Sequence, residues 1–240
     1  RKIMSEDIAV LMAAGMGTRM RPLTEKVPKP LVKVHGVSMI ETVINGLKNR
    51  GIERIILVTG YLGEQFQYLQ GKYEGITIVA NTEYETINNI SSIYAAMPYI
   101  NGKNCFICEA DLYVKDISVF QMEMTQSGYF GKMVLGHSDD WVFEQNKEGY
   151  ITRVGKSGDN CYNMCGISYF IKEDMKVITD AIEEAYKHPG YEDLFWDDIV
   201  NQEIKKVNLK IYPVRDDQIV EIDSVAELKA VDPDYIRWNN

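Results

Sequence analysis

The chain has 240 residues, of which 45% are apolar and 25% are charged, and its formal net charge is −9. The apolar content is that of a globular protein with a full core, and the acidic balance argues against nucleic acid or an anionic membrane surface as a partner. No apolar run approaches the ~20 residues that a transmembrane helix needs, so we expect no membrane insertion.

The first half of the chain alternates short apolar runs with helical segments. The pattern predicts strands at residues 8–12, 54–59, 76–80 and 104–109, and helices at 38–50, 62–69 and 90–97. Ser38 stands three residues before Glu41 at the start of the first helix, which predicts a capping box. Strands that alternate with helices of this length form βαβ units and a mostly parallel sheet.

After Asp111 the pattern becomes richer in strands. It predicts strands at residues 132–135, 141–145, 150–154, 164–170, 209–214 and 219–222, with helices at 173–186, 194–203 and from 224 onward. A turn at residues 146–149 indicates antiparallel pairing of its neighbours. No linker or repeat divides the chain, so we expect one α/β domain over residues 1–240, with a mostly parallel central sheet and an antiparallel subregion.

In an open α/β sheet the ligand lies beyond the carboxyl ends of the strands. The strand ends predicted here deliver four loops to one crevice: residues 14–31, 60–62, 81–89 and 110–113. We therefore expect the functional residues on these loops.

The most informative segment runs from Ile8 to Leu31 and reads IAVLMAAGMGTRMRPLTEKVPKPL. A predicted buried strand ends there in a loop of small residues. Glycines allow the positive φ angles and close backbone approach with which consecutive N–H groups bind an anion. Basic residues follow directly, among them Arg19 and Lys29. The combination predicts a polyphosphate site, with a nucleotide as its occupant.

Two common nucleotide-binding motifs do not fit this segment. Met20 stands where a dinucleotide fingerprint has its third glycine, and no G-x-x-x-x-G-K-[ST] occurs. Residues Gly15–Leu31 instead match G-x-G-T-R-x-x-P-x-T-x-x-x-P-K-x-L. This pattern resembles the nucleotidyltransferases that join an NTP to a phosphorylated small molecule and release pyrophosphate. The alternative is a glycine-rich turn followed by a solvated basic loop.

The four cysteines predict neither a zinc site nor a disulfide. Cys105 and Cys108 are three positions apart on a predicted strand and face opposite sides, and Cys161 and Cys165 have no histidine nearby. We expect buried free thiols in a reducing cytosol. The opening segment RKIMSED has no apolar region of the kind found in secretory signals, so we expect a cytoplasmic protein.

Two aspartates are candidate ligands for Mg²⁺, which is needed where two polyanions are joined. Asp111 and Asp223 each follow a predicted strand, and Mg²⁺ uses one or two carboxylates besides substrate phosphates. Both positions match the metal-binding carboxylates of the nucleotidyltransferases. Glu109 and Glu221 alternate with them along the same strands, and we expect these two to face differently. A role in capping a loop or a helix is the alternative for both aspartates.

Aromatic and acidic residues of the second half predict an acceptor that carries a cation. Trp141 follows two aspartates, and Phe195 and Trp196 lie among acidic residues. Aromatic faces beside carboxylates bind an ammonium group by cation–π attraction and charge. Alternatively, Phe195 and Trp196 begin an amphipathic helix and pack into the core.

Over nearly the whole chain the sequence is similar to the bacterial CTP:phosphocholine cytidylyltransferases, and also to 2-aminoethylphosphonate cytidylyltransferases. The matching segments are residues 13–25, 60–66, 88–89, 110–111, 193–197 and 221–225. The resemblance implies a Rossmann-like nucleotidyltransferase domain with an antiparallel substrate-binding subregion, and Mg²⁺-dependent transfer of CMP from CTP. The chain departs at Phe195, where the family can have tyrosine, so the ring is kept and a hydroxyl is lost.

The resemblance also implies a role for individual residues. Arg19 is implied to bind the β- and γ-phosphates, and Lys29 to stabilise charge at the α-phosphate or the acceptor anion. The implied nucleotide-binding residues are Ala13, Gly15, Met16, Gly17, Thr18, Asn81, Asn88 and Ser92. The implied acceptor-binding residues are Trp141, Asp193, Phe195, Trp196, Asp197 and Glu221, and the implied metal ligands are Asp111 and Asp223.

The acceptor stays open among three small molecules, because ring and carboxylate residues are both present. Phosphocholine comes first, 2-aminoethylphosphonate is the close second, and phosphoethanolamine is third. A sugar-1-phosphate nucleotidyltransferase would share the Gly15–Leu31 motif, and an inactive nucleotide-binding scaffold is a further alternative that the retained charged residues argue against. A chain that starts at Arg1 without an initiator Met is compatible with a fragment of a longer fused enzyme and equally with tag residues. For partner chains, a fused domain and a homo-oligomer both stay open.

Overall fold

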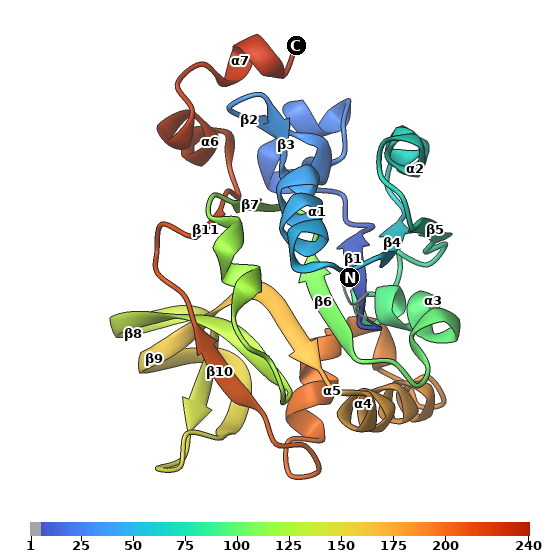
Figure 1. Ribbon diagram of the computed structural model, residues 1–240, viewed down its shortest axis with the longest axis vertical. Coiled ribbons are helices and arrows are strands. Elements are labelled where there is room, and N and C mark those ends of the chain that lie inside the picture. Colours follow the sequence, from blue (N-terminus) through green and yellow to red (C-terminus); the bar gives the residue numbers. More distant parts are fainter. Residues whose placement is uncertain (1–5) are drawn as a thin grey trace, which may run out of the picture.

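The computed structural model describes residues 6–240, so most of the opening segment discussed above lies outside the described residues. Its centre is a seven-stranded sheet (Figure 1). In spatial order its strands are β10 (Lys210–Pro213), β8 (Gly128–Gln145), β9 (Ile151–Phe170), β6 (Cys105–Glu109), β1 (Ile8–Ala13), β4 (Arg54–Thr59) and β5 (Ile76–Ala80). Parallel pairs join β1 to β4 and β6, β4 to β5, and β10 to β8, whereas β9 is antiparallel to β6 and β8. This confirms the α/β class and the mostly parallel sheet.

Two small antiparallel ladders, seven α-helices and six short 3-10 helices complete the described part of the chain. The ladders are β2 (Lys33–Val34) with β3 (Val37–Ser38), and β7 (Leu112–Val114) with β11 (Ile219–Glu221). The helices are α1 (Met39–Arg50), α2 (Tyr68–Lys72), α3 (Ile90–Ile100), α4 (Lys172–Ala185), α5 (Trp196–Gln202), α6 (Val225–Val231) and α7 (Tyr235–Trp238). None of these helices is long and apolar enough to cross a bilayer.

The central strands β1, β4 and β6 have side chains buried on both faces of the sheet, because successive side chains of a strand point to opposite sides and both faces are covered. On β1, Ala9 and Leu11 belong to the core cluster that α1 covers, while Ile8 and Val10 belong to the cluster under α3, α4 and α5. Burial of each large aliphatic side chain contributes about 1.5–3 kcal/mol. The central strands are therefore held rigidly, with their carboxyl ends at a fixed edge.

The first helix confirms the prediction except at its cap. α1 follows Ser38 and ends at Gly51, whose φ of 98° is the left-handed conformation in which glycine is the usual residue. The Ser38 hydroxyl, however, donates to the Glu41 carboxylate at 2.8 Å and makes no bond to the helix backbone. The predicted capping box is wrong, because the Ser38 hydroxyl donates to Glu41 and not to the start of the helix. Glu41 also forms an ion pair with Lys72 at 2.6 Å.

The separate strands predicted between residues 132 and 170 form one long hairpin. β8 has 18 residues and β9 has 20, and they join through the predicted turn, where the Asn146 N–H donates to the Tyr150 carbonyl at 2.9 Å. The apolar period fades at the exposed positions of β8 around Leu135, but backbone pairing continues through register shifts. The prediction from hydropathy therefore divided β8 and β9, which are continuous strands, into shorter ones.

Two other predicted helices have different bounds. The helix expected at residues 62–69 is a 3-10 turn over Gly63–Phe66 followed by α2, with Leu62 at a positive φ of 50°. The helix expected from residue 194 starts at Trp196. All four cysteines are free, as predicted, and Cys105 and Cys108 lie in clusters on opposite faces of the sheet. Burial is confirmed for Cys105, Cys108 and Cys165, whereas Cys161 is half-buried.

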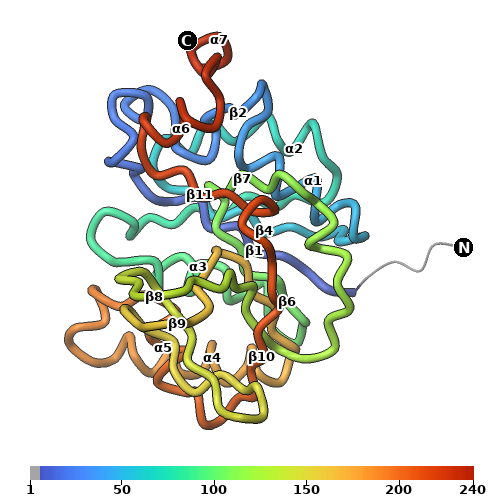
Figure 2. The backbone as a smooth tube through the Cα atoms, turned by 90° about the vertical axis from the view of Figure 1, so that its left-hand side faces the viewer, coloured from blue at the N-terminus to red at the C-terminus, as the bar shows by residue number. Residues whose placement is uncertain are grey.

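Figures 1 and 2 show that the elements separate into two ends with β1 and β6 between them. The hairpin β8–β9, together with β10, α4 and α5, forms one end, and β2 lies near the C-terminal α6 and α7 at the other. Asn239 ties the C-terminus to this second end, because its amide nitrogen donates to the Lys33 carbonyl at 2.8 Å. The carboxyl ends of β1 and β6 thus open between two differently built walls.

Candidate functional site

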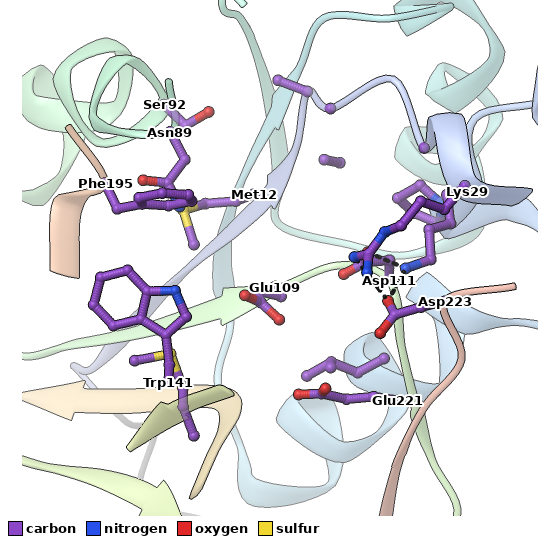
Figure 3. Close-up of a pocket in the computed structure, with 18 of the residues that line it drawn as sticks. Met12, Lys29, Asn89, Ser92, Glu109, Asp111, Trp141, Phe195, Glu221 and Asp223 are labelled. Atoms are coloured by element: carbon purple, nitrogen blue, oxygen red, sulfur yellow. Dashed lines mark hydrogen bonds and ion pairs between the residues drawn. The ribbon is translucent and has the colours of Figure 1, made fainter. Parts of the chain in front are cut away.

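A cavity of about 520 Å³ lies at the carboxyl ends of β1 and β6 (Figure 3). Its lining residues are Met12, Ala13, Ala14, Gly15, Gly17, Arg19, Lys29, Pro30, Asn89, Ser92, Glu109, Asp111, Leu112, Asp139, Asp140, Trp141, Lys156, Met164, Phe195, Glu221 and Asp223. The predicted loops at 14–31 and 110–113 both contribute. The loop at 81–89 contributes only Asn89, and the loop at 60–62 contributes nothing.

The loop after β1 has a backbone that only glycine fits. Gly17 adopts a left-handed conformation with φ 57°, and a Cβ atom there would lie 2.8 Å from the Cβ of Lys29. Thr24 holds the turn, since its hydroxyl donates to the Gly17 carbonyl at 2.6 Å. The glycine therefore lets the loop backbone lie directly against the Lys29 side chain.

Lys29 joins two carboxylates that come from distant parts of the chain. Its Nζ lies 2.9 Å from Asp111 Oδ2 and 2.8 Å from Asp223 Oδ1. The first aspartate follows β6 and the second follows β11. Burial alone would lower the pKa of Lys29, but attraction and hydrogen bonds to the two aspartates raise this pKa above its usual value. The side chain is thus a permanent cation at the cavity wall.

Arg19 lies at the mouth of the same wall. Its guanidinium is 3.5 Å from Asp223, and 77% of its side chain is exposed. An exposed guanidinium held this loosely is free to turn toward an anion, at little cost in ion-pair energy. A smaller cavity of about 250 Å³ beside it is lined by Thr18 and Met20, among others.

More acidic than basic side chains line the large cavity. Six carboxylates line it, against the three cationic side chains Arg19, Lys29 and Lys156. The carboxylates are Glu109, Asp111, Asp139, Asp140, Glu221 and Asp223. Such a cavity does not attract a triphosphate by itself, so a polyanionic ligand needs additional cations there.

Glu109 and Glu221 line the cavity together with the two aspartates, so the expectation that they face differently is wrong. Residues two apart on a strand share a face. Burial raises the pKa of Glu109 well above its usual value, and repulsion from Asp111 and Glu221 adds to this. The Glu221 side chain is exposed to the cavity, yet the protein packed around it removes enough hydration to raise its pKa to about 7, and Asp223 adds to this.

Trp141 from β8 and Phe195, which precedes α5, form an aromatic corner on the opposite side of the cavity (Figure 3). Their ring centroids are 5.3 Å apart and their planes meet at 69°. Figure 3 shows Glu109 between this corner and the wall formed by Lys29, Asp111 and Asp223. The cavity thus has an aromatic half and a charged half.

The structure places Trp196 and Asp197 in the core, which corrects their assignment to the acceptor site. Trp196 is only 3% exposed and packs against Tyr129 and Phe170, with centroids 6.0 and 5.7 Å away. Asp197 is buried and accepts a hydrogen bond of 2.8 Å from the Tyr129 hydroxyl. Their helical positions turn both side chains inward, so packing, the alternative weighed above, holds for Trp196 but not for Phe195.

Several predicted nucleotide- and acceptor-binding residues lie outside the cavity wall. Asn81 is buried and its amide donates to Ser91 and Ser92 at 2.9 and 3.1 Å. Asn88 binds the backbone N–H of its neighbour Asn89. Met16, Thr18 and Asp193 are likewise absent from the lining of the large cavity. Asn81 therefore supports Ser92, which does line it, instead of contacting a ligand directly.

Other lining residues had no individual signal in the sequence. Met12 and Met164 follow ordinary strand patterns, and Lys156 is one of many lysines. Asn89 follows the predicted Asn88 and directly precedes α3, which begins at Ile90. Its place at the start of this helix is the one signal that could have indicated it. Met12, Lys156 and Met164 reach the cavity through the tertiary pairing of strands.

The donor set of the charged half fits Mg²⁺. Asp111 and Asp223 both contact a single Nζ atom, so their carboxylates are close enough to share one cation. Within residues 6–240, no group of three or more His, Cys, Asp and Glu side chains is arranged to hold a metal. A pair of carboxylates still suffices for Mg²⁺ where substrate phosphates and water complete the shell.

Residues 8–129 match the nucleotidyl transferase family. A 2-aminoethylphosphonate cytidylyltransferase of Lancefieldella rimae is 51% identical over 95% of this chain and 93% of its own. A choline-phosphate cytidylyltransferase of Streptococcus pneumoniae is 32% identical over 93% of this chain and 96% of its own.

A solved structure extends this similarity to three dimensions. The structure of the CTP:phosphocholine cytidylyltransferase from Streptococcus pneumoniae superposes with a TM-score of 0.86 and 31% identity, over 95% of this chain and 98% of that one. The motif at Gly15–Leu31, the fold and these relatives agree. The chain therefore belongs to the nucleotidyl transferase family and is a cytidylyltransferase.

Proposed function

We propose that this enzyme transfers CMP from CTP to 2-aminoethylphosphonate and releases pyrophosphate. The observation that carries the proposal is the division of one cavity into a wall with Lys29 and Arg19 and an opposite side with the Trp141 and Phe195 rings, while the Asp140 carboxylate, which has no ion pair among the described residues, lines the same cavity. The 51% identity to a 2-aminoethylphosphonate cytidylyltransferase supports this acceptor. The order of the first two acceptors is thereby the reverse of that drawn from the sequence.

The charged half is the proposed nucleotide site. Backbone N–H groups at residues 14–17 and the Arg19 guanidinium hold the β- and γ-phosphates, which leave as pyrophosphate. Lys29 neutralises charge at the α-phosphorus while an acceptor oxygen attacks in line. The acceptor is already ionised near neutral pH, so the protein acts by positioning and charge and needs no general base.

The aromatic half is the proposed ammonium site. Asp139 is engaged by His137, whose Nε2 lies 2.8 Å from the carboxylate. The Asp140 carboxylate makes no ion pair within the described residues and lines the same cavity. A primary ammonium has N–H groups for such a carboxylate, whereas a quaternary ammonium has none. This favours an acceptor with a primary amine.

Mg²⁺ is proposed at Asp111 and Asp223. When bound there, it would neutralise phosphate charge in a cavity whose own side chains are mostly acidic. Lys29 Nζ contacts both carboxylates, and we propose that it neutralises charge at the α-phosphate of bound CTP from this position. Asp111→Asn and Asp223→Asn should each raise the Mg²⁺ requirement, because each removes a hard anionic ligand.

Pyrophosphate release tests the function directly. Purified protein is incubated with CTP, Mg²⁺ and one acceptor at a time: 2-aminoethylphosphonate, phosphocholine, phosphoethanolamine or glucose 1-phosphate. We expect the highest kcat/KM with 2-aminoethylphosphonate and no turnover after EDTA treatment. A higher kcat/KM with phosphocholine would replace the proposed acceptor, and parent-rate turnover in EDTA would refute the metal site.

Phosphocholine is the second candidate because the aromatic corner has the geometry of a cation site. Two rings at 69° offer their faces to one cation. The phosphocholine interpretation predicts that the rings contribute more to acceptor binding than Asp140 does. Trp141→Ala and Asp140→Asn, measured with both acceptors, separate the two candidates.

A further inference from the structure

The ammonium group of Lys156 lies at the aromatic corner. Its Nζ is 5.9 Å from the centroid of the Trp141 ring and 5.5 Å from that of the Phe195 ring. Lys156 is on β9 and is the cross-strand partner of Trp141 on β8, so the hairpin itself delivers the cation to the rings. Both distances are within the range of cation–π attraction.

This contact with the rings is the main interaction of the Lys156 side chain. No ion pair or hydrogen bond holds its Nζ among the residues that the structure describes, although its backbone carbonyl accepts a bond from Arg153 at 3.3 Å. Two acidic side chains, Asp139 and Asp140, line the same cavity without pairing with it. The rings, not a carboxylate, thus determine where this exposed lysine rests.

We propose that Lys156 is a specificity-determining residue: a tethered primary ammonium that occupies the aromatic corner and excludes quaternary ammonium groups from it. The inference rests on the proposed function, because it concerns the acceptor half of that site. A quaternary ammonium has no N–H group and depends on the ring faces, so it must displace Lys156. A primary ammonium can bind at the unpaired Asp140 carboxylate and leave Lys156 in place.

Lys156→Met is the decisive variant, because methionine keeps a long unbranched side chain and removes the charge. Without the competing cation, we expect kcat/KM for phosphocholine to rise about fivefold, the size of one exposed cation–π contact. For 2-aminoethylphosphonate we expect a change below about twofold, since its ammonium binds elsewhere. Lys156→Arg keeps a cation over the rings and should retain the parent ratio of the two values.

Lys147→Met is the matched control, because Lys147 is exposed in the turn of the same hairpin and lies outside the cavity wall. It should leave both acceptors unchanged, which separates the loss of one particular cation from a change in net charge. An unchanged ratio of the two kcat/KM values in Lys156→Met would overturn the proposal. A fall in kcat with every acceptor would also overturn it, because Lys156 would then contact the phosphates.

A binding measurement keeps this test independent of activity. Tetramethylammonium is titrated into the parent and Lys156→Met, with tryptophan fluorescence as the signal and Trp141→Phe to identify its source. We expect a Kd about fivefold lower for Lys156→Met than for the parent. If no acceptor releases pyrophosphate, the proposed function fails while this titration still decides the role of Lys156. Equal Kd values for the two proteins would refute that role.

Discussion

At the scale of single residues, the site depends on charges that are held in place before any ligand arrives. Lys29 is only 8% exposed, yet it keeps its proton because two aspartates compensate its burial. A cation that is already ordered loses little entropy when charge develops nearby, and this is how preorganised groups stabilise a transition state.

Lys29→Ala is expected to lower kcat/KM by two orders of magnitude or more, equivalent to about 3 kcal/mol of transition-state stabilisation. The fold should survive, since Asp111 and Asp223 face the cavity and are 31% and 33% exposed. Lys26→Ala, an exposed lysine of the same loop, is the control and should retain parent activity. Activity of Lys29→Ala within about threefold of the parent would remove this lysine from the chemistry.

Two glycines of one loop should respond differently to the same substitution. Gly17→Ala places a Cβ 2.8 Å from the Lys29 Cβ at a positive φ, and we expect a lower melting temperature and lower activity. A Cβ at Gly15 meets nothing within 4 Å. Gly15→Ala should therefore melt like the parent and raise the KM for CTP, because the added methyl projects where the phosphates are proposed to bind. Equal melting temperatures for both variants would contradict this account.

At the scale of elements, the start of α5 divides neighbouring side chains between two environments. Phe195 precedes the helix and lines the cavity, while Trp196 begins it and packs into the core beneath β9. An irregular register between Ser138 and Trp141 on β8 accompanies the turn of Trp141 toward the same cavity. Irregularities of this kind commonly re-aim a side chain at a site.

Trp141→Ala and Trp196→Ala should therefore affect different properties, the first acceptor binding and the second stability. Trp141→Ala is expected to raise the KM for phosphocholine, the acceptor that depends on the ring faces, and to leave the CTP KM and the melting temperature near parent values. Trp196→Ala should lower the free energy of unfolding by about 3–5 kcal/mol, as the loss of a fully buried ring does. Thermal melts and the two KM values measure both effects. A stable Trp196→Ala with a raised acceptor KM would restore Trp196 to the acceptor site.

At the scale of the whole molecule, one sheet separates two large apolar clusters, and the layer that contains α3, α4 and α5 also holds a buried acid. Asp197 lies on α5 beside the buried Trp196, and its carboxylate accepts a hydrogen bond from the Tyr129 hydroxyl. Burial raises its pKa from 3.8 to about 7. A carboxyl group kept protonated in the core makes stability depend on pH.

Asp197→Asn should flatten that dependence. Between pH 3.8 and about pH 7 the Asp197 carboxyl keeps a proton in the folded protein that it has released in the unfolded chain. Its presence therefore lowers the free energy of unfolding as the pH rises. The free energy of unfolding falls by at most about 1.4 kcal/mol per pH unit. The fall ends once the carboxyl is ionised in both the folded and the unfolded protein. Urea unfolding at about pH 5 and about pH 8 should therefore show a larger gain for Asp197→Asn at the higher pH. An equal difference at both values would mean that Asp197 is ionised in the fold.

The sequence by itself determined the features that depend on local order along the chain. Residues Gly15–Leu31 indicated a nucleotide site because backbone turn and charge are close together in sequence, and the alternation of strands and helices predicted the parallel part of the sheet. The tertiary structure decided which side chains meet. It buried Trp196 and Asp197 while Phe195 faced the cavity, because a helix start turns consecutive side chains in different directions. It also brought Lys156 to Trp141, since strand register, which exposed residues specify only weakly, determines which residues of β8 and β9 are neighbours.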